Sequence, residues 1–374
     1  NDNFEKFVTQ VDSELRRQLS DTDPPKAGLV MTQLWIELGQ LDRALESRRE
    51  LRKATHTLLK SKPKIRLKQK FKSQWHNLSW HLAIKLLKDG RFSEGWELYE
   101  HGLQVKAEGP QRWQRALFKP FSTEEVSLWK GQDLANKNIL LLAEQGIGDT
   151  MMFATLIPSL VEEGANVFLH PGPRLDSIYR RSFDNVTIID RFKLPNAKIF
   201  DYQSPLGSVP QYRFNDIKDY AKHTPILKAN QKVTKLLRKK YFKGKPLVGI
   251  SWQGGGKSSR IPLKSIELKQ LLKILKRKDV TFVSLQYGNL EKEIENFQTV
   301  YNTRIINDKS IDPLRDMDKW LSQVDAMDYV ISVANTTVHG AGGLGKPTFC
   351  LVSNRADWRW IDPDVHDDCY WYEA

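Results

Sequence analysis

The sequence has little cysteine: only Cys350 and Cys369 occur among its 374 residues. Two cysteines exclude a disulfide framework and a cysteine-rich zinc site, and they fit a reducing compartment. No apolar run approaches the ~20 residues that a membrane span needs, and the N-terminus lacks the apolar region of a signal peptide. We therefore expect a cytoplasmic protein without a membrane span. The chain starts at Asn1 rather than Met, so we also expect a fragment of a longer chain.

Acidic residues are fewer than basic ones: the chain has 45 Asp and Glu and 58 Lys and Arg, which gives a net charge of +13. The excess favours anionic partners, namely nucleic acid, phosphorylated small molecules or an acidic membrane surface. Residues 52–72 and 228–245 hold nine and eight basic residues and no acidic one. Neither run is interleaved with aromatic residues as a groove for single-stranded nucleic acid would be. Solvated helix faces or linkers are the simpler interpretation of both runs.

The first 115 residues have the apolar spacing of helices and contain an internal repeat. Gly39 aligns with Gly90, and Ala44 aligns with Gly95. Such copies are typical of tetratricopeptide repeats, whose unit is about 34 residues. The two glycines are 51 positions apart, so an insertion of about 17 residues falls between the copies, near the first basic run. We predict a tetratricopeptide-like helical region over residues 1–115, capped by the next domain because two copies are too few for a solenoid.

From residue 137 onward, short apolar runs alternate with helical stretches, as in parallel α/β folds. We predict one Rossmann-like lobe over residues 137–228 and a second over residues 246–374, since about 100–200 residues per domain leaves room for both. The predicted strands are residues 138–143, 167–170, 186–189, 247–252, 280–285, 329–332 and 348–352, with a helix over residues 151–163. Ligands in such folds lie beyond the carboxyl ends of the strands, so we looked for chemistry there.

The first motif is EQGIGDT at residues 144–150, between a predicted strand and a predicted helix. Gly146 and Gly148 would let the backbone approach a ligand, and the helix N-terminus offers N–H groups to an oxyanion. Asp149 would then face the ligand, or it would simply cap the helix, as Asp commonly does. The segment is not a dinucleotide-binding fingerprint, because Met151 replaces the third glycine.

The second motif is SVANTTVHGAGGLGKP at residues 332–347, which runs from strand to polar turn to a helix rich in glycine. The segment comprising Asn335, Thr336, Thr337 and Val338 can cap the helix and cradle a diphosphate with its backbone N–H groups. His339 lies in the first turn, where it would donate to the same phosphate. A capped helix with a core histidine is the alternative interpretation.

The third motif is WQGGGKSSR at residues 252–260. Lys257 and Arg260 are well placed on this glycine loop to reach an anion, unless it is a flexible solvent loop.

Gln286 ends a predicted strand and is either a cleft residue or a buried structural glutamine. Asp362 and Asp364 have D-x-D spacing, but Pro363 between them favours a turn, and the histidines do not cluster. We predict no metal.

With these motifs, the chain resembles glycosyltransferase family 9, the ADP-heptose:lipopolysaccharide heptosyltransferases, whose GT-B fold pairs two Rossmann-type lobes. The N-terminal region resembles tetratricopeptide-repeat proteins, and the arrangement is more distantly similar to O-linked N-acetylglucosamine transferases. The matching segments lie in order at residues 94–100, 128–134, 143–150, 261–263, 282–286, 331–339, 345–347 and 357–360.

The resemblance implies a metal-independent, inverting glycosyltransferase that moves a sugar from a nucleotide-diphosphate donor to a protein or glycan hydroxyl. It implies that Asp149 is the general base and that the second lobe binds the donor diphosphate through residues 335–339. Lys257 or Arg260 would be the cationic clamp. No cofactor is implied beyond the nucleotide sugar as co-substrate, and the helical region would present the acceptor.

Three departures from the family keep other functions open. Asn335 stands where the family usually has Asp, and three glycines replace its Asn-rich, Arg-bearing loop. The chain also stops at Ala374, before the closing helices of a GT-B fold, so we expect a trimmed or reduced version. The alternative is a non-catalytic module that binds a protein or peptide. A nucleic-acid binder is favoured by charge alone.

Overall fold

The computed structural model describes residues 24–60, 65–105, 120–190, 192–220, 225–255, 261–288, 290–353, 358–360 and 369–372, together with positions 6, 9–10, 13–14, 17, 115 and 222. The chain forms two compact units. The helical unit comprises Asn1–Arg115 and Asp357–Asp367, and the α/β unit comprises Ala116–Ala356 and Asp368–Ala374. Both sheets of the structure therefore belong to one unit. Within the described residues, no helix has the length and apolar character needed to cross a membrane.

Among its described elements, the helical unit contains two helix pairs, in which α2 packs on α3 and α4 packs on α5. Their bounds are α2 Pro24–Glu37, α3 Leu41–Lys60, α4 Ile65–Lys88 and α5 Phe92–Tyr99, followed by the 3₁₀ helix η1 Glu100–Leu103. The chain returns to this unit later, since Trp358 packs edge-on against Trp96 and Tyr99 of α5.

The two helix pairs share one turn geometry, as the aligned glycines predict. Gly39 and Gly90 have φ angles of 72° and 73°, which favour glycine because a Cβ is strained in that region. The residue after each glycine donates a 2.9 Å backbone hydrogen bond into the preceding helix, from Gln40 to Trp35 and from Arg91 to Leu86. The internal repeat is therefore real at the level of the turn, and its tetratricopeptide identity stays a prediction.

The inserted residues between the copies lengthen the helices. Helices α3 and α4 span 20 and 24 residues, and both continue into the first basic run. Residues 61–64, within that run, lie outside the described residues.

The first sheet of the α/β unit has four parallel strands in the order β3-β2-β1-β4. Its elements are β1 Asn138–Leu142, α6 Ile147–Ala154, α7 Ile157–Glu162, β2 Asn166–His170, α8 Asp176–Ser182, β3 Val186–Ile188, β4 Tyr202–Pro205 and α9 Pro210–Arg213. Strand β1 is central, and its apolar side chains are buried on both faces, which explains its continuous apolar run.

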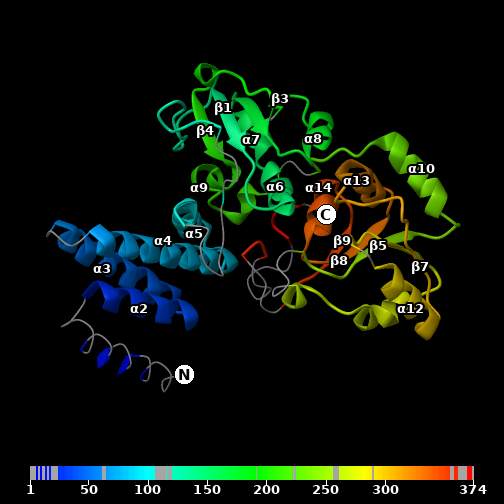
Figure 1. The fold of residues 1–374 in the computed structure, drawn as a ribbon, viewed down its shortest axis with the longest axis horizontal. Coiled ribbons are helices and arrows are strands. Elements are labelled where there is room, and N and C mark those ends of the chain that lie inside the picture. The colour runs from blue at the N-terminus through cyan, green and yellow to red at the C-terminus, as the bar shows by residue number, and fades with distance from the viewer. Residues whose placement is uncertain are drawn as a thin grey trace. The chain divides into compact units, whose positions relative to one another are not determined.

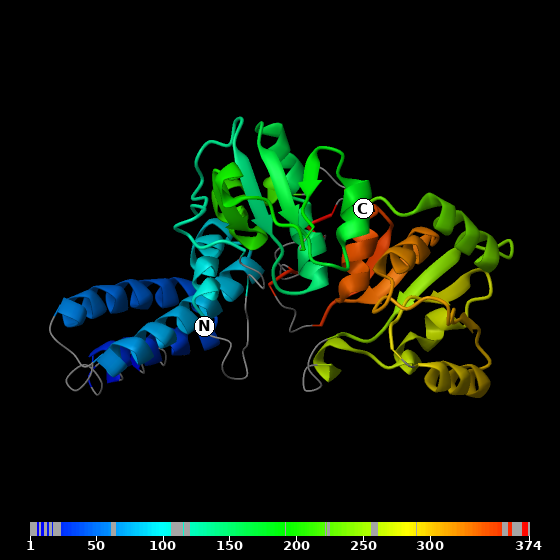
Figure 2. The same ribbon diagram turned by 45° about the horizontal axis from the view of Figure 1, so that its top comes forward.

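The second sheet has five parallel strands in the order β7-β6-β5-β8-β9 (Figure 1). Its elements are α10 Gln231–Tyr241, β5 Leu247–Ser251, α11 Leu272–Leu275, β6 Thr281–Ser284, α12 Glu291–Tyr301, β7 Ile305–Ile306, α13 Met317–Asp325, β8 Tyr329–Val333, α14 Thr336–Gly343 and β9 Thr348–Leu351. Figure 2 shows the two sheets from another side, the first in green and the second from yellow-green to orange. All five residues of β5 are buried, so this strand is the centre of the second core.

The structure corrects two expectations about these elements and describes most of the second basic run. The helix predicted over residues 151–163 begins earlier, at Ile147, and is broken into α6 and α7, with Pro158 at the start of α7. Strands β4 and β7 were not predicted. The second basic run is largely the helix α10, and three of its cations are paired: Lys228 with Asp184, Arg238 with Asp328 and Lys240 with Asp308.

Candidate functional site

The three motifs follow the strands at which strand order reverses. In the first sheet β2 and β3 lie on one side of β1, and β4 lies on the other. In the second sheet β6 and β7 lie on one side of β5, and β8 and β9 on the other. Such reversals open a crevice at the carboxyl ends of the strands, where open α/β sheets bind ligands. The motifs follow β1, β5 and β8, the strands beside these reversals, so all three lie at the strand ends where a ligand is expected.

The first motif forms the turn between β1 and α6. Gln145 has a φ of 59°, and Gly146 then takes the N-cap position of α6. The Gly146 N–H donates to Asp149 Oδ2 over 2.9 Å, so the carboxylate of Asp149 does form the capping contact. Asp149 is half-buried. A carboxylate has several lone pairs, so this contact leaves its role as a base a prediction.

The second motif forms the turn between β8 and α14, with Asn335 as the N-cap. Asn335 Oδ1 accepts a hydrogen bond from the Thr337 N–H over 2.8 Å, and the Val338 N–H donates to the Asn335 carbonyl over 3.2 Å. The side chains of Thr337 and Val338 are buried, whereas Thr336 is half-buried. Asn335 therefore already accepts hydrogen bonds from two of the backbone N–H groups that a diphosphate would use, those of Thr337 and Val338.

The amide nitrogen of Asn335 ties this turn to the turn after β5. It donates to Ser251 Oγ over 2.7 Å and to the Gln253 carbonyl over 3.0 Å. Gln286 Oε1 accepts from Ser251 Oγ and from the N–H groups of Trp252 and Gln253, over 2.8 to 3.0 Å. The structure thus gives Gln286, which follows β6, structural contacts with the end of β5 and the turn after it. Its role as a cleft residue stays a prediction.

The third motif is described only at its start. Cβ atoms added at Gly254 and Gly255 would lie 2.5 Å from Lys264 Cβ and from the Tyr287 hydroxyl oxygen, so these glycines permit close packing. Gly256, Lys257 and Arg260 lie outside the described residues, and the predicted cationic clamp with them.

Helix α14 packs against helix α6, which brings the second motif to the first (Figures 1 and 2). His339 of α14 is 4% exposed. A Cβ added at Gly148 would lie 2.7 Å from His339 Cδ2, so glycine is required where the imidazole meets the first turn of α6. His339 Nδ1 lies 3.0 Å from the hydroxyl oxygen of Tyr372. The structure gives His339 the burial of a core histidine, at the contact between the first turns of α6 and α14. Its role toward a phosphate stays a prediction.

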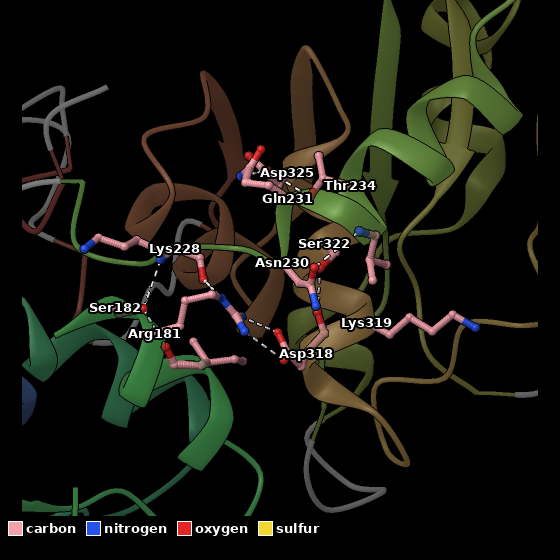
Figure 3. Close-up of polar contacts among 12 residues, drawn as sticks. Arg181, Ser182, Lys228, Asn230, Gln231, Thr234, Asp318, Lys319, Ser322 and Asp325 are labelled. Atoms are coloured by element: carbon pink, nitrogen blue, oxygen red, sulfur yellow. Dashed lines mark hydrogen bonds and ion pairs between the residues drawn. The ribbon is translucent and has the colours of Figure 1, made fainter. Parts of the chain in front are cut away.

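Two parts of this region were missed from sequence. Tyr372 belongs to an aromatic segment near the C-terminus, whose only sequence signal is its run of aromatic residues. Arg181 of α8 pairs with Asp318 of α13, and its Nε donates to the Lys228 carbonyl over 2.8 Å (Figure 3). No sequence signal could pair Arg181 with Asp318, since they are 137 positions apart. Among the described residues, no group of three or more His, Cys, Asp or Glu side chains could hold a metal ion.

No protein-family model matches the chain. A curated relative, Protein FlbA of Caulobacter vibrioides, is 28% identical over 314 residues, which cover 78% of this chain and 50% of FlbA. The chain thus spans about half the length of the curated relative it matches.

Solved structures similar to the chain include a glycosyltransferase family 9 protein of Veillonella parvula, with a TM-score of 0.42 and 11% identity over 59% of this chain and 82% of that one. The ADP-heptose lipopolysaccharide heptosyltransferase II of E. coli has a TM-score of 0.39 and 12% identity, over 57% of this chain and 84% of that one. The glycosyltransferase TibC of enterotoxigenic E. coli has a TM-score of 0.40 and 10% identity, over 60% of each chain.

Proposed function

We propose that the α/β unit is a glycosyltransferase that binds a nucleotide sugar and transfers the sugar to a hydroxyl of a protein or glycan. The observation that carries the proposal is the meeting of α6 and α14, each of which begins directly after a strand at a reversal of strand order. Two helix N-termini directed at one region favour an anionic ligand, because each carries partial positive charge and backbone N–H donors.

In the proposed reaction, each site residue has a separate role. Asp149 would take the proton from the acceptor hydroxyl as this oxygen attacks the anomeric carbon. The first turn of α14, from Thr336 onward, and His339 would stabilise the negative charge that develops on the leaving phosphate. Attack from the face opposite the leaving group inverts the anomeric centre. In this proposal Lys257 or Arg260 supplies the positive charge beside the leaving phosphate, so no metal ion is needed. The helical unit recruits the acceptor.

A nucleotide screen tests the proposal directly. UDP, GDP, ADP, CMP and their sugar conjugates are titrated into the protein by calorimetry, and melting is followed in parallel. A ligand at 100 times its dissociation constant stabilises the fold by about 2.7 kcal/mol, which a melting scan resolves. We expect one nucleotide to bind. We also expect Asp149→Asn to bind it about equally well while losing release of sugar from the donor, since Asn keeps an acceptor for the Gly146 N–H.

Asp176→Asn is the matched control, because Asp176 is also an acid in the first turn of a helix, α8, remote from these turns in the sequence. It should leave both binding and sugar release unchanged. If no nucleotide binds to the folded protein, the transferase proposal is wrong.

The second candidate is a non-catalytic module that binds a protein or peptide. It is favoured by the capping contact of Asp149 and by the structural contacts of Asn335, which account for both side chains without a substrate. This function predicts partner binding that is independent of any nucleotide.

A further inference from the structure

Arg48 of α3 is a buried cation whose hydrogen bonds go to neutral groups. Its side chain donates from Nε to Ser79 Oγ over 2.9 Å, and its Nη2 lies 2.9 Å from His101 Nε2. The guanidinium also lies over the ring of Trp75, 4.4 Å from the ring centroid. His101 is neutral, because burial and then the charge of Arg48 lower its pKa to about 3. The positive charge of Arg48 is therefore held by packing and polar contacts, without an ion pair.

The charges around Arg48 leave it largely uncompensated. Burial lowers the pKa of Arg48 to about 10, and the charges of Arg52 and Arg49 act in the same direction against that of Glu97 on α5. Glu97 is exposed, and the described contacts of Arg48 include no ion pair with it. An arginine with a lowered pKa has an excess of positive neighbours or too little solvent, and Arg48 has both.

Two exposed cations, one from each helix, flank the buried layer of Arg48 and His76. Helices α3 and α4 pack on each other and are joined by only four residues, so they run antiparallel (Figure 1). Arg52 follows Arg48 by one turn of α3, and Lys72 precedes His76 by one turn of α4, so both lie toward the connection between the helices. Burial, followed by the charges of Lys72 and Arg48, lowers the pKa of His76, which indicates that these cations lie near one another.

We call Arg48, Arg52 and Lys72 the cationic cluster. Within the described residues, none of the three forms an ion pair, whereas Arg91 of the same helical unit pairs with two carboxylates. A carboxylate beside the cluster would be attracted by three charges at once, one of them shielded from solvent. The cluster therefore has the charge of an anion-binding surface.

The surroundings of the cluster favour an acidic peptide as the anion. Residues 52–72 hold nine basic residues and no acidic one, so positive charge continues from the cluster along both helices. An extended chain of carboxylates matches such a strip better than a single small anion does. Single-stranded nucleic acid would also need aromatic faces for its bases. Trp75 already has Arg48 over its ring and His101 at its side, with ring centroids 6.1 Å apart.

We propose that the helical unit binds an acidic peptide segment of a partner protein on the cationic cluster, with Arg52 and Lys72 as the direct contacts and Arg48 as a buried charge beside them. Exposed guanidinium and ammonium groups bind carboxylates through charged hydrogen bonds. The inference goes beyond the proposed function, because peptide binding here needs neither a nucleotide nor a sugar.

The test measures binding of a fluorescein-labelled peptide of alternating Glu and Ser to the full chain by fluorescence anisotropy. Lys85→Gln is the matched control for Lys72→Gln, because both lysines are exposed on α4 and the charge change is the same. We expect Arg52→Gln and Lys72→Gln each to weaken binding about three- to fivefold, the upper part of the range for one exposed charge pair. The double variant should lose at least about tenfold, and Lys85→Gln should bind as wild type does.

Several results would overturn the proposal. A peptide of alternating Gln and Ser should not bind, and binding of the acidic peptide should weaken as salt is raised. If the acidic peptide does not bind wild type, or if Arg52→Gln and Lys72→Gln lose no more affinity than Lys85→Gln, the proposal is wrong. A single-stranded RNA or a DNA duplex that binds the cluster more tightly than the peptide would also overturn it. Circular dichroism checks that each variant is folded. Because no nucleotide is used, a failure of the proposed function leaves these results unaffected.

Discussion

At the scale of single residues, Asn335 makes contacts that a carboxylate could not make. Its Oδ1 accepts from the Thr337 N–H and from Ser332 Oγ, and its Nδ2 donates to Ser251 Oγ and to the Gln253 carbonyl. A carboxylate can keep the first pair of contacts but has no proton for the second pair. The amide of Asn335 therefore joins the turns after β5 and β8 through two donors that a carboxylate lacks.

We predict that Asn335→Asp destabilises the α/β unit by about 1–3 kcal/mol, because a carboxylate oxygen would meet the Gln253 carbonyl oxygen in place of an N–H donor. Urea denaturation followed by tryptophan fluorescence measures this change. Asn230→Asp is the matched control: Asn230 caps α10 through Oδ1 alone, accepting from Lys232 and Val233, and Asp caps a helix about as well. Equal losses in the two variants would show that the amide donors contribute nothing.

At the scale of elements, α3, α4 and η1 are joined by a chain of hydrogen bonds without a carboxylate. Arg48 of α3 lies 2.9 Å from His101 Nε2, and His101 Nδ1 lies 2.8 Å from His76 Nδ1 of α4. Arginine always donates, so His101 Nε2 accepts, and His101 must then carry its proton on Nδ1 and donate it to His76. The contacts hold only while both histidines are neutral.

This cluster predicts that the helical unit loses stability in acid. Burial, followed by the charges of Arg48, His76 and Arg52, lowers the pKa of His101 to about 3, and burial with Lys72 and Arg48 lowers that of His76. Below the ordinary histidine pKa of about 6.5, the unfolded chain binds a proton that the folded unit refuses, so stability is complete above pH 6.5 and falls toward pH 3.

The slope for one such proton is at most about 1.4 kcal/mol per pH unit. Urea denaturation between pH 7.5 and 4, followed by far-ultraviolet circular dichroism, gives the pH dependence of stability. His101→Gln should flatten it, since glutamine can accept from Arg48 and donate to His76 without titrating. An unchanged slope in His101→Gln would contradict the role given to this histidine.

At the scale of the whole molecule, one arginine links the helices of both sheets. Arg181 of α8, beside the first sheet, pairs with Asp318 of α13, beside the second, and also holds the Lys228 carbonyl of the segment between the sheets (Figure 3). The backbone N–H of Lys228 in turn donates to Ser182 Oγ over 2.9 Å. These contacts join α8 to α13 and to the segment between the sheets.

Asp318→Asn should therefore lower the free energy of unfolding of the α/β unit by about 1–3 kcal/mol, the range for a charged hydrogen bond that is partly buried. Asp176→Asn is the comparison, because Asp176 pairs with Arg180 on the surface of α8 alone and such pairs contribute only about 0.3–0.5 kcal/mol. Thermal and urea denaturation of both variants give the two losses. A loss in Asp318→Asn no larger than that in Asp176→Asn would exclude a role for this pair in joining the sheets.

Much of the fold was predictable because its signals are local. The continuous apolar runs of β1, β5 and β8 identify buried parallel strands without knowledge of their neighbours. Strand β4 was missed because its sequence YQSP is polar and ends in proline, and β7 because it has only two residues. The break between α6 and α7 follows from Pro158, which the apolar spacing obscured.

The sequence by itself determined the alternation of strands and helices apart from β4, β7 and the break between α6 and α7. It also determined the paired glycine turns at Gly39 and Gly90 and the three motifs after β1, β5 and β8, because each depends on residues within one turn or one strand. Only the tertiary structure decided that His339 meets Gly148 and Tyr372 and that Arg181 meets Asp318. His339 and Tyr372 are 33 positions apart, and Arg181 and Asp318 are 137 apart. Contacts at such separations arise when packed helices bring distant segments together, and apolar spacing along the chain says which face is buried but not which partner it meets.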